Sequence, residues 1–235
     1  MSVVLAFDTA TAATVVGLST AAGIVGERRD RPAPGTRPNH AEQLLALSAE
    51  LLAEAQLRWR DVTRIGVGVG PGTFTGLRIG VATGRALAQA SGTALVAVST
   101  LEALALAARS AVPGASVVAV LDARRGEAFV ASWSSEGTQA GPVQAVAPAA
   151  LGTLVAAHAG PVVAVGDGAV RFRAALETAG AVVAPDGDPS HEVHGKALCE
   201  LARAGELIAA ADLLPQYVRL PDAEIARRER LGEPA

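Results

Sequence analysis

The sequence predicts an α/β protein built on mixed β-sheets, and the order of its apolar segments carries this prediction. Three short strand patterns follow one another with only turns between them, at residues 3–7, 13–19 and 24–29, and the first of them is a continuous apolar run. A long amphipathic helical pattern, residues 39–55, separates them from a fourth strand pattern at 64–69. Strands joined by turns pair antiparallel, whereas strands joined through a helix pair parallel. The chain is therefore expected to start with an antiparallel meander that parallel crossovers continue.

The second half of the chain repeats the alternation of strands and helices more weakly. Apolar runs at 116–121 and 128–133 flank a polar turn, and a third run at 162–165 precedes another helical pattern. Pro113-Gly114 marks the predicted boundary between the halves. We expect two lobes and a loose charged tail, at residues 1–110, 111–220 and 221–235 respectively.

The composition narrows the class of protein. The 235 residues are 50% hydrophobic and 18% charged, which suits a packed core and excludes a disordered chain. A net charge of −3 provides no basic field to hold nucleic acid directly. The single cysteine, Cys199, excludes an internal disulfide and a cysteine-based zinc site, and its helical setting predicts a buried thiol. No apolar run reaches the ~20 residues of a membrane span without charged or Gly/Pro breaks. Met1 leads straight into a strand, so we expect no signal peptide and a cytoplasmic protein.

Glycines dominate the segment that runs from the fourth strand into the following helix. Gly66 and Gly68 alternate along the strand, so one of its faces is bare backbone that something must approach closely. In the helix, glycines recur every fourth residue at 76, 80 and 84, which places them on one stripe. Each interior glycine costs a helix about 0.5–1 kcal/mol relative to alanine. The stripe therefore predicts close packing, either of the helix on its own sheet or against a helix of another subunit.

We predict a partner interface on this helix and on the amphipathic helix before it, because together they offer a flat two-helix surface. On that interpretation Gly80→Leu should keep its melting temperature and lose association, since the added side chain would push the subunits apart. The predicted interface is drawn from both helices: His40, Leu44, Leu47, Leu51, Gly76, Leu77, Gly80, Val81, Gly84 and Ala88.

Three motifs resemble those of one protein family. The run GPGTFTGLRIGVATGRALA at residues 70–88, the turn DARRGE at 122–127 and PQYVR at 215–219 are similar to signatures of the TsaB (YeaZ) family. Membership implies the two-lobed actin/hexokinase/Hsp70-like (ASKHA) fold. It also implies a non-catalytic partner of TsaD that works with the ATPase TsaE. Their complex forms N6-threonylcarbamoyladenosine (t6A) at position 37 of tRNAs that read ANN codons. The resemblance further implies a homodimer when the chain is alone, and tRNA contact only through the complex.

The resemblance also bears on metal and cofactor chemistry. TsaD carries two histidines four residues apart on the first helix, and these bind a metal. Here His40 is followed by Leu44 at that spacing, so we expect no metal. The glycine-rich loop is not a complete phosphate loop, because Gly76 is followed by Leu77-Arg78 and not by a Lys. We expect no cofactor within the chain. The alternative is that ATP or ADP binds at the interface between subunits.

A few polar residues are candidates for contacts in the cleft between the lobes. In ASKHA proteins the acidic residue that ends the first strand faces phosphate or its metal, and Asp8 occupies that place. The alternative is a turn carboxylate that accepts hydrogen bonds from neighbouring amides. Asp122 and Arg124 either contact a ligand or form a salt bridge within their turn, which contributes under about 1 kcal/mol when exposed. His191 and His194 lie beside a turn and are predicted to be surface residues.

The alternative function is an enzyme with its own active site in the cleft: an ASKHA-type ATP-dependent kinase or acyl transferase, or a peptidase. A kinase needs carboxylates and a phosphate cradle around Mg-ATP. A peptidase needs a nucleophile with its base, or a metal. The four histidines and one cysteine show no spacing for a peptidase, and the glycine support for a kinase is incomplete. The sequence therefore favours a partner protein over an enzyme.

Overall fold

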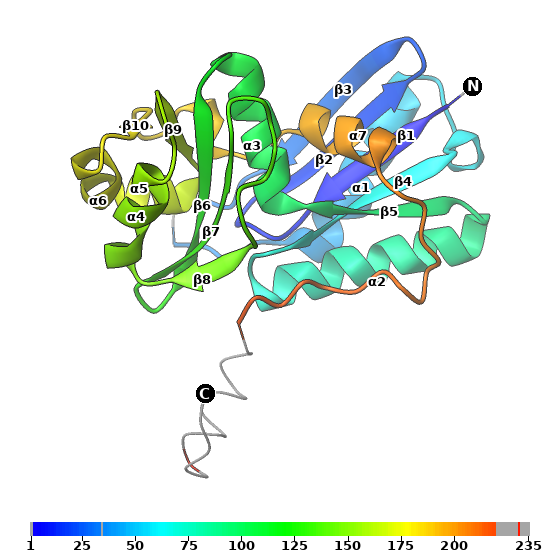
Figure 1. Cartoon of the computed structure of the whole chain (residues 1–235). Coiled ribbons are helices and arrows are strands. Elements are labelled where there is room, and N and C mark those ends of the chain that lie inside the picture. Colours follow the sequence, from blue (N-terminus) through cyan, green and yellow to red (C-terminus); the bar gives the residue numbers. More distant parts are fainter. Residues whose placement is uncertain (1, 34, 220–229, 231–235) are drawn as a thin grey trace.

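A computed structural model describes residues 2–33, 35–219 and 230, which form two lobes (Figure 1). Each lobe has a five-stranded sheet, in the order β3-β2-β1-β4-β5 in the first and β10-β9-β6-β7-β8 in the second. In the first sheet β1 pairs antiparallel with β2 and parallel with β4, and β5 continues the parallel part. The predicted fold class, α/β with two mixed sheets flanked by helices, is confirmed. None of the helices in the described residues is long and apolar enough to cross a membrane.

The first lobe draws its sheet from the first hundred residues. Its β1 is apolar and wholly buried up to Asp8, because the sheet is covered on both faces. The elements are β1 (Val4–Asp8), β2 (Thr14–Thr20), β3 (Gly23–Asp30), α1 (His40–Glu54), the 3-10 turn η1 (Trp59–Asp61), β4 (Arg64–Gly70), α2 (Phe74–Ser91), β5 (Ala94–Ser99) and α3 (Thr100–Ala111).

The second lobe repeats the topology of the first. β6 to β10 occupy the same order in their sheet as β1 to β5, including the antiparallel β6–β7 hairpin and the parallel β6–β9 pair. The elements are β6 (Ser116–Arg124), β7 (Glu127–Trp133), β8 (Gln144–Val146), η2 (Pro148–Ala150), α4 (Leu151–Ala156), β9 (Val162–Val165), α5 (Asp167–Arg171), α6 (Arg173–Thr178), β10 (Val182–Val183), η3 (Pro189–His191) and α7 (Gly195–Ala204).

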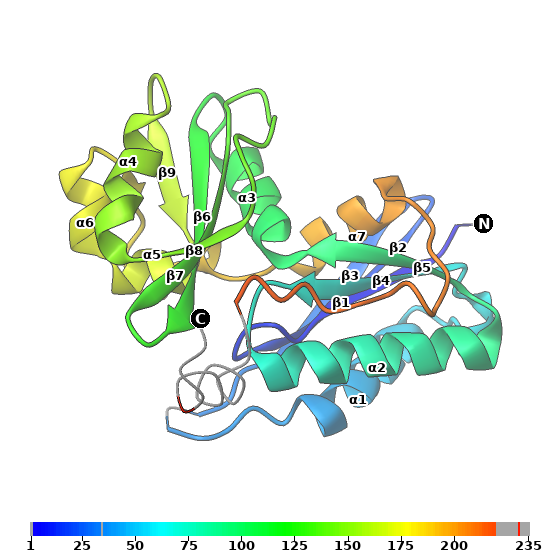
Figure 2. The same cartoon turned by 60° about the horizontal axis from the view of Figure 1, so that its bottom comes forward.

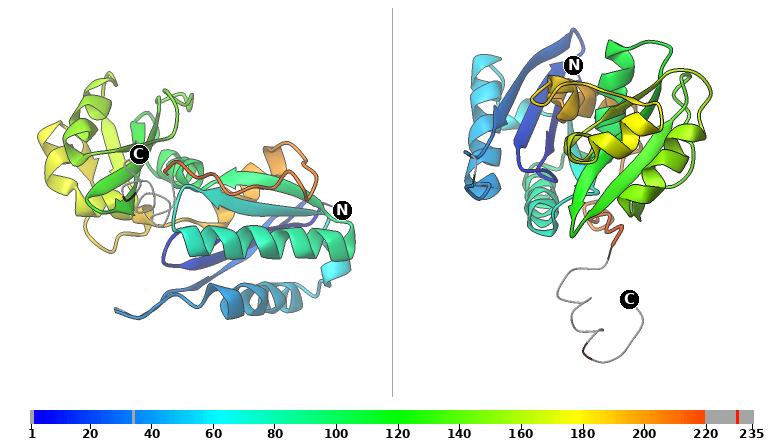
Figure 3. Two further views of the ribbon diagram at one scale, coloured as in Figure 1. Left: turned by 90° about the horizontal axis from the view of Figure 1, so that it is seen from below. Right: turned by 90° about the vertical axis from the view of Figure 1, so that its left-hand side faces the viewer.

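The last helix of each repeat lies between the two sheets. One hydrophobic core joins Val4 of β1 to Val117 of β6 through Leu104 of α3 and Leu198 of α7. Figure 2 and the left panel of Figure 3 show α1 and α2 side by side on one face of the first sheet, with α7 on the opposite face. The predicted second lobe, residues 111–220, thus includes a stretch that packs on the first sheet. The predicted tail, 221–235, lies outside the described residues except for Arg230.

Glycines let α7 approach the first sheet closely. A Cβ on Gly66 of β4 would overlap the side chain of Ala202, and one on Gly17 of β2 would overlap the backbone of Gly195. The predicted bare strand face therefore has its close neighbour, and this neighbour is α7. Cys199 is fully buried on the same helix, as predicted, and burial raises the pKa of its thiol to about 12.

The segment after α7, residues 206–219, runs back along β5 and α2, and we call it the closing segment. The Ile208 amide donates to Leu95 O over 2.9 Å, and the Gln216 amide donates to Val69 O over 2.7 Å. Leu213 is fully buried, and its carbonyl accepts from Arg85 Nε over 2.9 Å. These contacts fix the closing segment to one flank of α2.

The glycine stripe of α2 packs inward. A Cβ on Gly76 would overlap the carbonyl oxygen of Thr9. One on Gly80 would lie 2.6 Å from Thr9 Oγ1, and one on Gly84 would lie 2.6 Å from a methyl group of Val67. Thr9 Oγ1 also donates to Gly76 O over 2.7 Å, which ties the β1–β2 turn to the helix. Packing on the chain's own sheet explains the stripe, and its prediction as a contact with another subunit is wrong.

Gly76→Ala should lower the free energy of unfolding by about 1–3 kcal/mol despite the higher helix propensity of alanine. The new methyl group meets backbone, which cannot turn away as a side chain can. Urea unfolding followed by circular dichroism would measure the change. Ala82→Leu, on the exposed side of the same helix, is the control and should leave stability nearly unchanged. Equal stability of Gly76→Ala and the parent chain would contradict the inward packing.

Candidate functional site

The residues predicted to form a partner interface are all buried within the single chain. Leu44 and Leu51 are each only 1% exposed, and they pack in one core with Phe7 and Leu18 of the first sheet. On α2, Val81 and Ala88 belong to the same core. The predicted interface is therefore wrong in its residues, because these side chains attach the two helices to their own sheet.

The outer side of the α1–α2 layer carries many small apolar side chains, and Glu42, Glu50 and Glu54 of α1 are exposed among them. We call this surface the alanine face. Leu45 is its large apolar side chain, and it is 44% exposed. The exposed apolar members are Ala41, Leu45, Ala46, Ala49 and Ala53 of α1 and Ala82, Ala86 and Ala90 of α2. Spacing of four residues along each helix could have identified this stripe in the sequence, but alanine carries too weak a hydrophobic signal to distinguish it from ordinary helix surface.

His40 is buried at the start of α1 and serves the fold. Its Nδ1 lies 2.8 Å from Thr14 Oγ1 of β2, and burial lowers the pKa of the imidazole below its ordinary value. Leu44, one turn later, points into the core. In the part of the chain that the structure describes, no group of three or more His, Cys, Asp or Glu side chains is arranged to hold a metal ion.

The buried His40 predicts a loss of stability in mild acid. Its pKa in the folded chain lies below the ordinary 6.5, so the unfolded chain binds a proton first as the pH falls. The free energy of unfolding should therefore decrease below 6.5 and level off once the pH passes the folded-state pKa. His40→Asn, which keeps an acceptor for Thr14, should flatten this decrease in urea titrations between about pH 8 and pH 5. Parallel curves for the two proteins would contradict the prediction.

Asp8 is a turn carboxylate inside the first lobe. One oxygen accepts from the Ala10 amide and the other from Thr100 Oγ1, each over 2.7 Å. A Cβ on Gly68 would overlap this carboxylate, so that glycine makes room for it. Burial raises the pKa of Asp8. Both of its oxygens are engaged by the chain itself, as in the turn alternative drawn from the sequence.

Asp122 and Arg124 meet within the β6–β7 turn. Asp122 accepts from Arg124 Nη1 over 3.1 Å and from Arg171 Nη1 over 2.8 Å, and its side chain is nearly buried. Arg124 and Arg125 both have positive φ angles, 64° and 50°, at an exposed hairpin end. The structure thus has the turn salt bridge. The structure also adds a second partner of Asp122, Arg171 of α5. This residue is 49 positions away, so the sequence alone does not predict the contact.

The cleft between the lobes is lined by other residues. A pocket of about 240 Å³ lies between Thr11–Ala13 of the first lobe, Leu121 and Asp167 of the second, and the connecting residues His191–Val193. His191 is buried here, so its prediction as a surface residue is wrong. Its Nε2 donates to Ala184 O over 3.0 Å.

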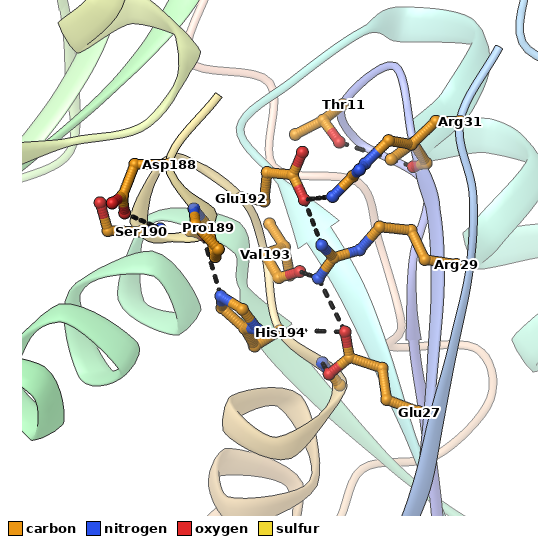
Figure 4. Close-up of polar contacts among 12 residues, drawn as sticks. Thr11, Glu27, Arg29, Arg31, Asp188, Pro189, Ser190, Glu192, Val193 and His194 are labelled. Atoms are coloured by element: carbon orange, nitrogen blue, oxygen red, sulfur yellow. Dashed lines mark hydrogen bonds and ion pairs between the residues drawn. The ribbon is translucent and has the colours of Figure 1, made fainter. Parts of the chain in front are cut away.

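An ionic network fastens the connecting residues to β3 (Figure 4). Arg29 forms ion pairs with Glu27, over 2.7 Å, and with Glu192, which also pairs with Arg31. Glu27 accepts from the Gly195 amide over 2.6 Å, so the first turn of α7 is held by the same carboxylate. This network gives these residues a structural role at the junction of the lobes.

Comparison with known proteins identifies the family. Residues 34–174 match the family model described as TsaD: tRNA N6-adenosine threonylcarbamoyltransferase. The chain is 27% identical to the tRNA threonylcarbamoyladenosine biosynthesis protein TsaB of Escherichia coli, covering 92% of this chain and 94% of that one. Its fold matches YeaZ from Pseudomonas aeruginosa with a TM-score of 0.75 at 28% identity, over 92% of this chain and all of that one. The chain belongs to the TsaB (YeaZ) family.

Two further relatives are similar to the chain over most of its length. An uncharacterized protein of Mycobacterium tuberculosis is 32% identical over 95% of both chains. A second Pseudomonas aeruginosa structure, described as similar to the peptidase YEAZ, has a TM-score of 0.78 at 29% identity. It covers 93% of this chain and all of that one. The family name links the chain to t6A biosynthesis.

Proposed function

We propose that this member of the TsaB family is the non-catalytic partner subunit of the complex that forms t6A at position 37 of tRNAs reading ANN codons. In this proposal it binds a TsaD-type catalytic paralogue, works with the ATPase TsaE and holds no metal or cofactor of its own. It contacts tRNA only through the complex, forms a homodimer when the paralogue is absent, and works in the cytoplasm. The names of the Escherichia coli relative and of the matching family model support the link to t6A formation.

The alanine face carries the proposal. Small side chains allow two helices to approach closely, and a paralogue with the same fold would present an equivalent helix pair. Leu45 provides one large apolar side chain to enter a groove on the opposite pair. Glu54, at the end of α1, is engaged by Arg28 of β3. A surface of this kind is suited to bury apolar area against a protein and offers little to a small ligand.

The carboxylates of the first lobe and of the β6–β7 turn support a non-catalytic role. Asp8 is bonded through both oxygens to Ala10 and Thr100. Asp122 is shared between Arg124 and Arg171. A kinase needs such groups available to magnesium and phosphate. Freeing either carboxylate would leave its present partners unsatisfied, so these residues serve the fold in this proposal.

Ala86→Arg tests the role of the alanine face. A long charged side chain at a close helix crossing should weaken binding to the TsaD-type paralogue of the same organism by roughly tenfold or more, a change of about 1.4 kcal/mol or above. The melting temperature should not change, because Ala86 is exposed in the free chain. Isothermal titration calorimetry measures the affinity.

The matched control is Ala174→Arg, at an exposed alanine of α6 in the second lobe. It adds the same charge away from the alanine face and should bind like the parent chain. Undiminished binding of Ala86→Arg, with the parent pair forming normally, would remove the alanine face from the proposal.

A further inference from the structure

Two aromatic side chains stand exposed and adjacent at the start of α2. The chain has only four Phe, two Trp and one Tyr, yet Phe74 is 36% exposed and Tyr217 is 43% exposed. Burial of rings stabilises a core strongly, so the partial exposure of two of the seven aromatic side chains calls for an explanation. Exposed aromatic side chains grouped in this way are typical of binding surfaces.

Arg78 joins the two rings into one ordered group, which we call the aromatic platform. The rings of Phe74 and Tyr217 stack with centroids 5.3 Å apart. The guanidinium carbon of Arg78 lies 3.9 Å above the Phe74 ring, and Arg78 Nε donates to the Tyr217 hydroxyl over 3.2 Å. The backbone on the Tyr217 side is anchored, since the neighbouring Gln216 amide bonds to Val69 O. The platform is therefore already in place before any partner binds, which reduces the entropy lost on binding.

The guanidinium of Arg78 has N–H donors that are free to bind a partner. Its Nε is used by Tyr217, but within the described residues neither terminal amino group has a hydrogen-bond or ion-pair partner. Glu127 of β7 is paired over 2.7 Å with Arg219, which follows Tyr217 by two residues. A planar guanidinium that is held in place and exposed is suited to accept a carboxylate through two parallel hydrogen bonds.

The platform continues the exposed side of α2. Phe74, Arg78, Ala82 and Ala86 are spaced by four residues and all are exposed, so they form one line along the helix that ends in the alanine face. Tyr and Arg are also the residues that most often dominate the binding energy of protein interfaces. A partner bound to the alanine face and extending along α2 would therefore also contact the aromatic platform.

We infer that the aromatic platform is an anchor for a carboxylate-bearing segment of the protein that binds the alanine face. This inference rests on the proposed function, because that function supplies the partner. A protein carboxylate is favoured over RNA because the aromatic platform, as defined, contributes a single guanidinium, that of Arg78, and the whole chain carries a net charge of −3. Binding to a phosphate backbone relies on several basic groups acting together.

The test compares three platform variants in binding to the TsaD-type paralogue. Arg78→Ala should weaken binding at least tenfold, and Arg78→Lys nearly as much, because an ammonium group keeps the charge but not the paired donors. Tyr217→Phe should weaken it severalfold, since Arg78 loses the hydroxyl that orients it. Arg60→Ala is the matched control, because it removes an exposed arginine from η1 and should bind like the parent chain. Melting temperatures of all four should equal that of the parent.

Each result has a distinct meaning. A parent pair that forms, together with unchanged binding of Arg78→Ala, would overturn this inference and leave the proposed function standing. Failure of the parent chain to bind the paralogue would overturn both. Loss of tRNA binding by the Arg78→Ala complex, with the affinity between the subunits intact, would overturn the inference in favour of an RNA contact.

Discussion

Both faces of the first sheet are covered by backbone at distances that only glycine permits. On one face Gly76, Gly80 and Gly84 place α2 against the β1–β2 turn and β4. On the other, Gly17 and Gly66 admit the start and the end of α7. A side chain at most of these positions would meet backbone or a buried group, so the helices have little freedom to rotate. The rotation of α2 about its axis is consequently fixed, and with it the set of residues that the helix turns outward.

This constraint links the fold to the proposed function. Because the glycines of α2 face the sheet, its alanines at 82, 86 and 90 face solvent beside those of α1. The closing segment then lies along the other flank of α2 and brings Tyr217 to Phe74. Interior glycines cost helix stability, but here they allow α2 to lie close against the β1–β2 turn and β4. The ion pairs of Arg29 and Arg31 with Glu192 meanwhile fasten the connecting residues to the first sheet.

Most of the fold could be predicted from the sequence, but little of the candidate site could. Apolar runs and glycine breaks predicted the strands and long helices, and the bare face of β4 was correctly expected to have a close neighbour. The identity of that neighbour, α7, depends on contacts between residues far apart in the sequence, such as Arg64 Nη1 donating to Ala202 O, 138 residues away, over 2.9 Å. Periodicity identifies which side of a helix is buried, but not whether the chain itself or another subunit buries it. Periodicity thus predicts a partner contact for the leucines and glycines of α1 and α2, whereas the structure buries these residues in the chain's own core.

Hydrogen exchange across the chain, alone and in complex with its TsaD-type paralogue, tests the central claim most directly. Binding is expected to slow exchange in α1, in α2 and at residues 215–219, and to leave exchange in the β6–β7 hairpin unchanged. The glycine-contacted β1–β2 turn should already exchange slowly in the free chain. Slowing confined to the β6–β7 hairpin and the pocket between the lobes, with α1 and α2 unaffected, would contradict the account.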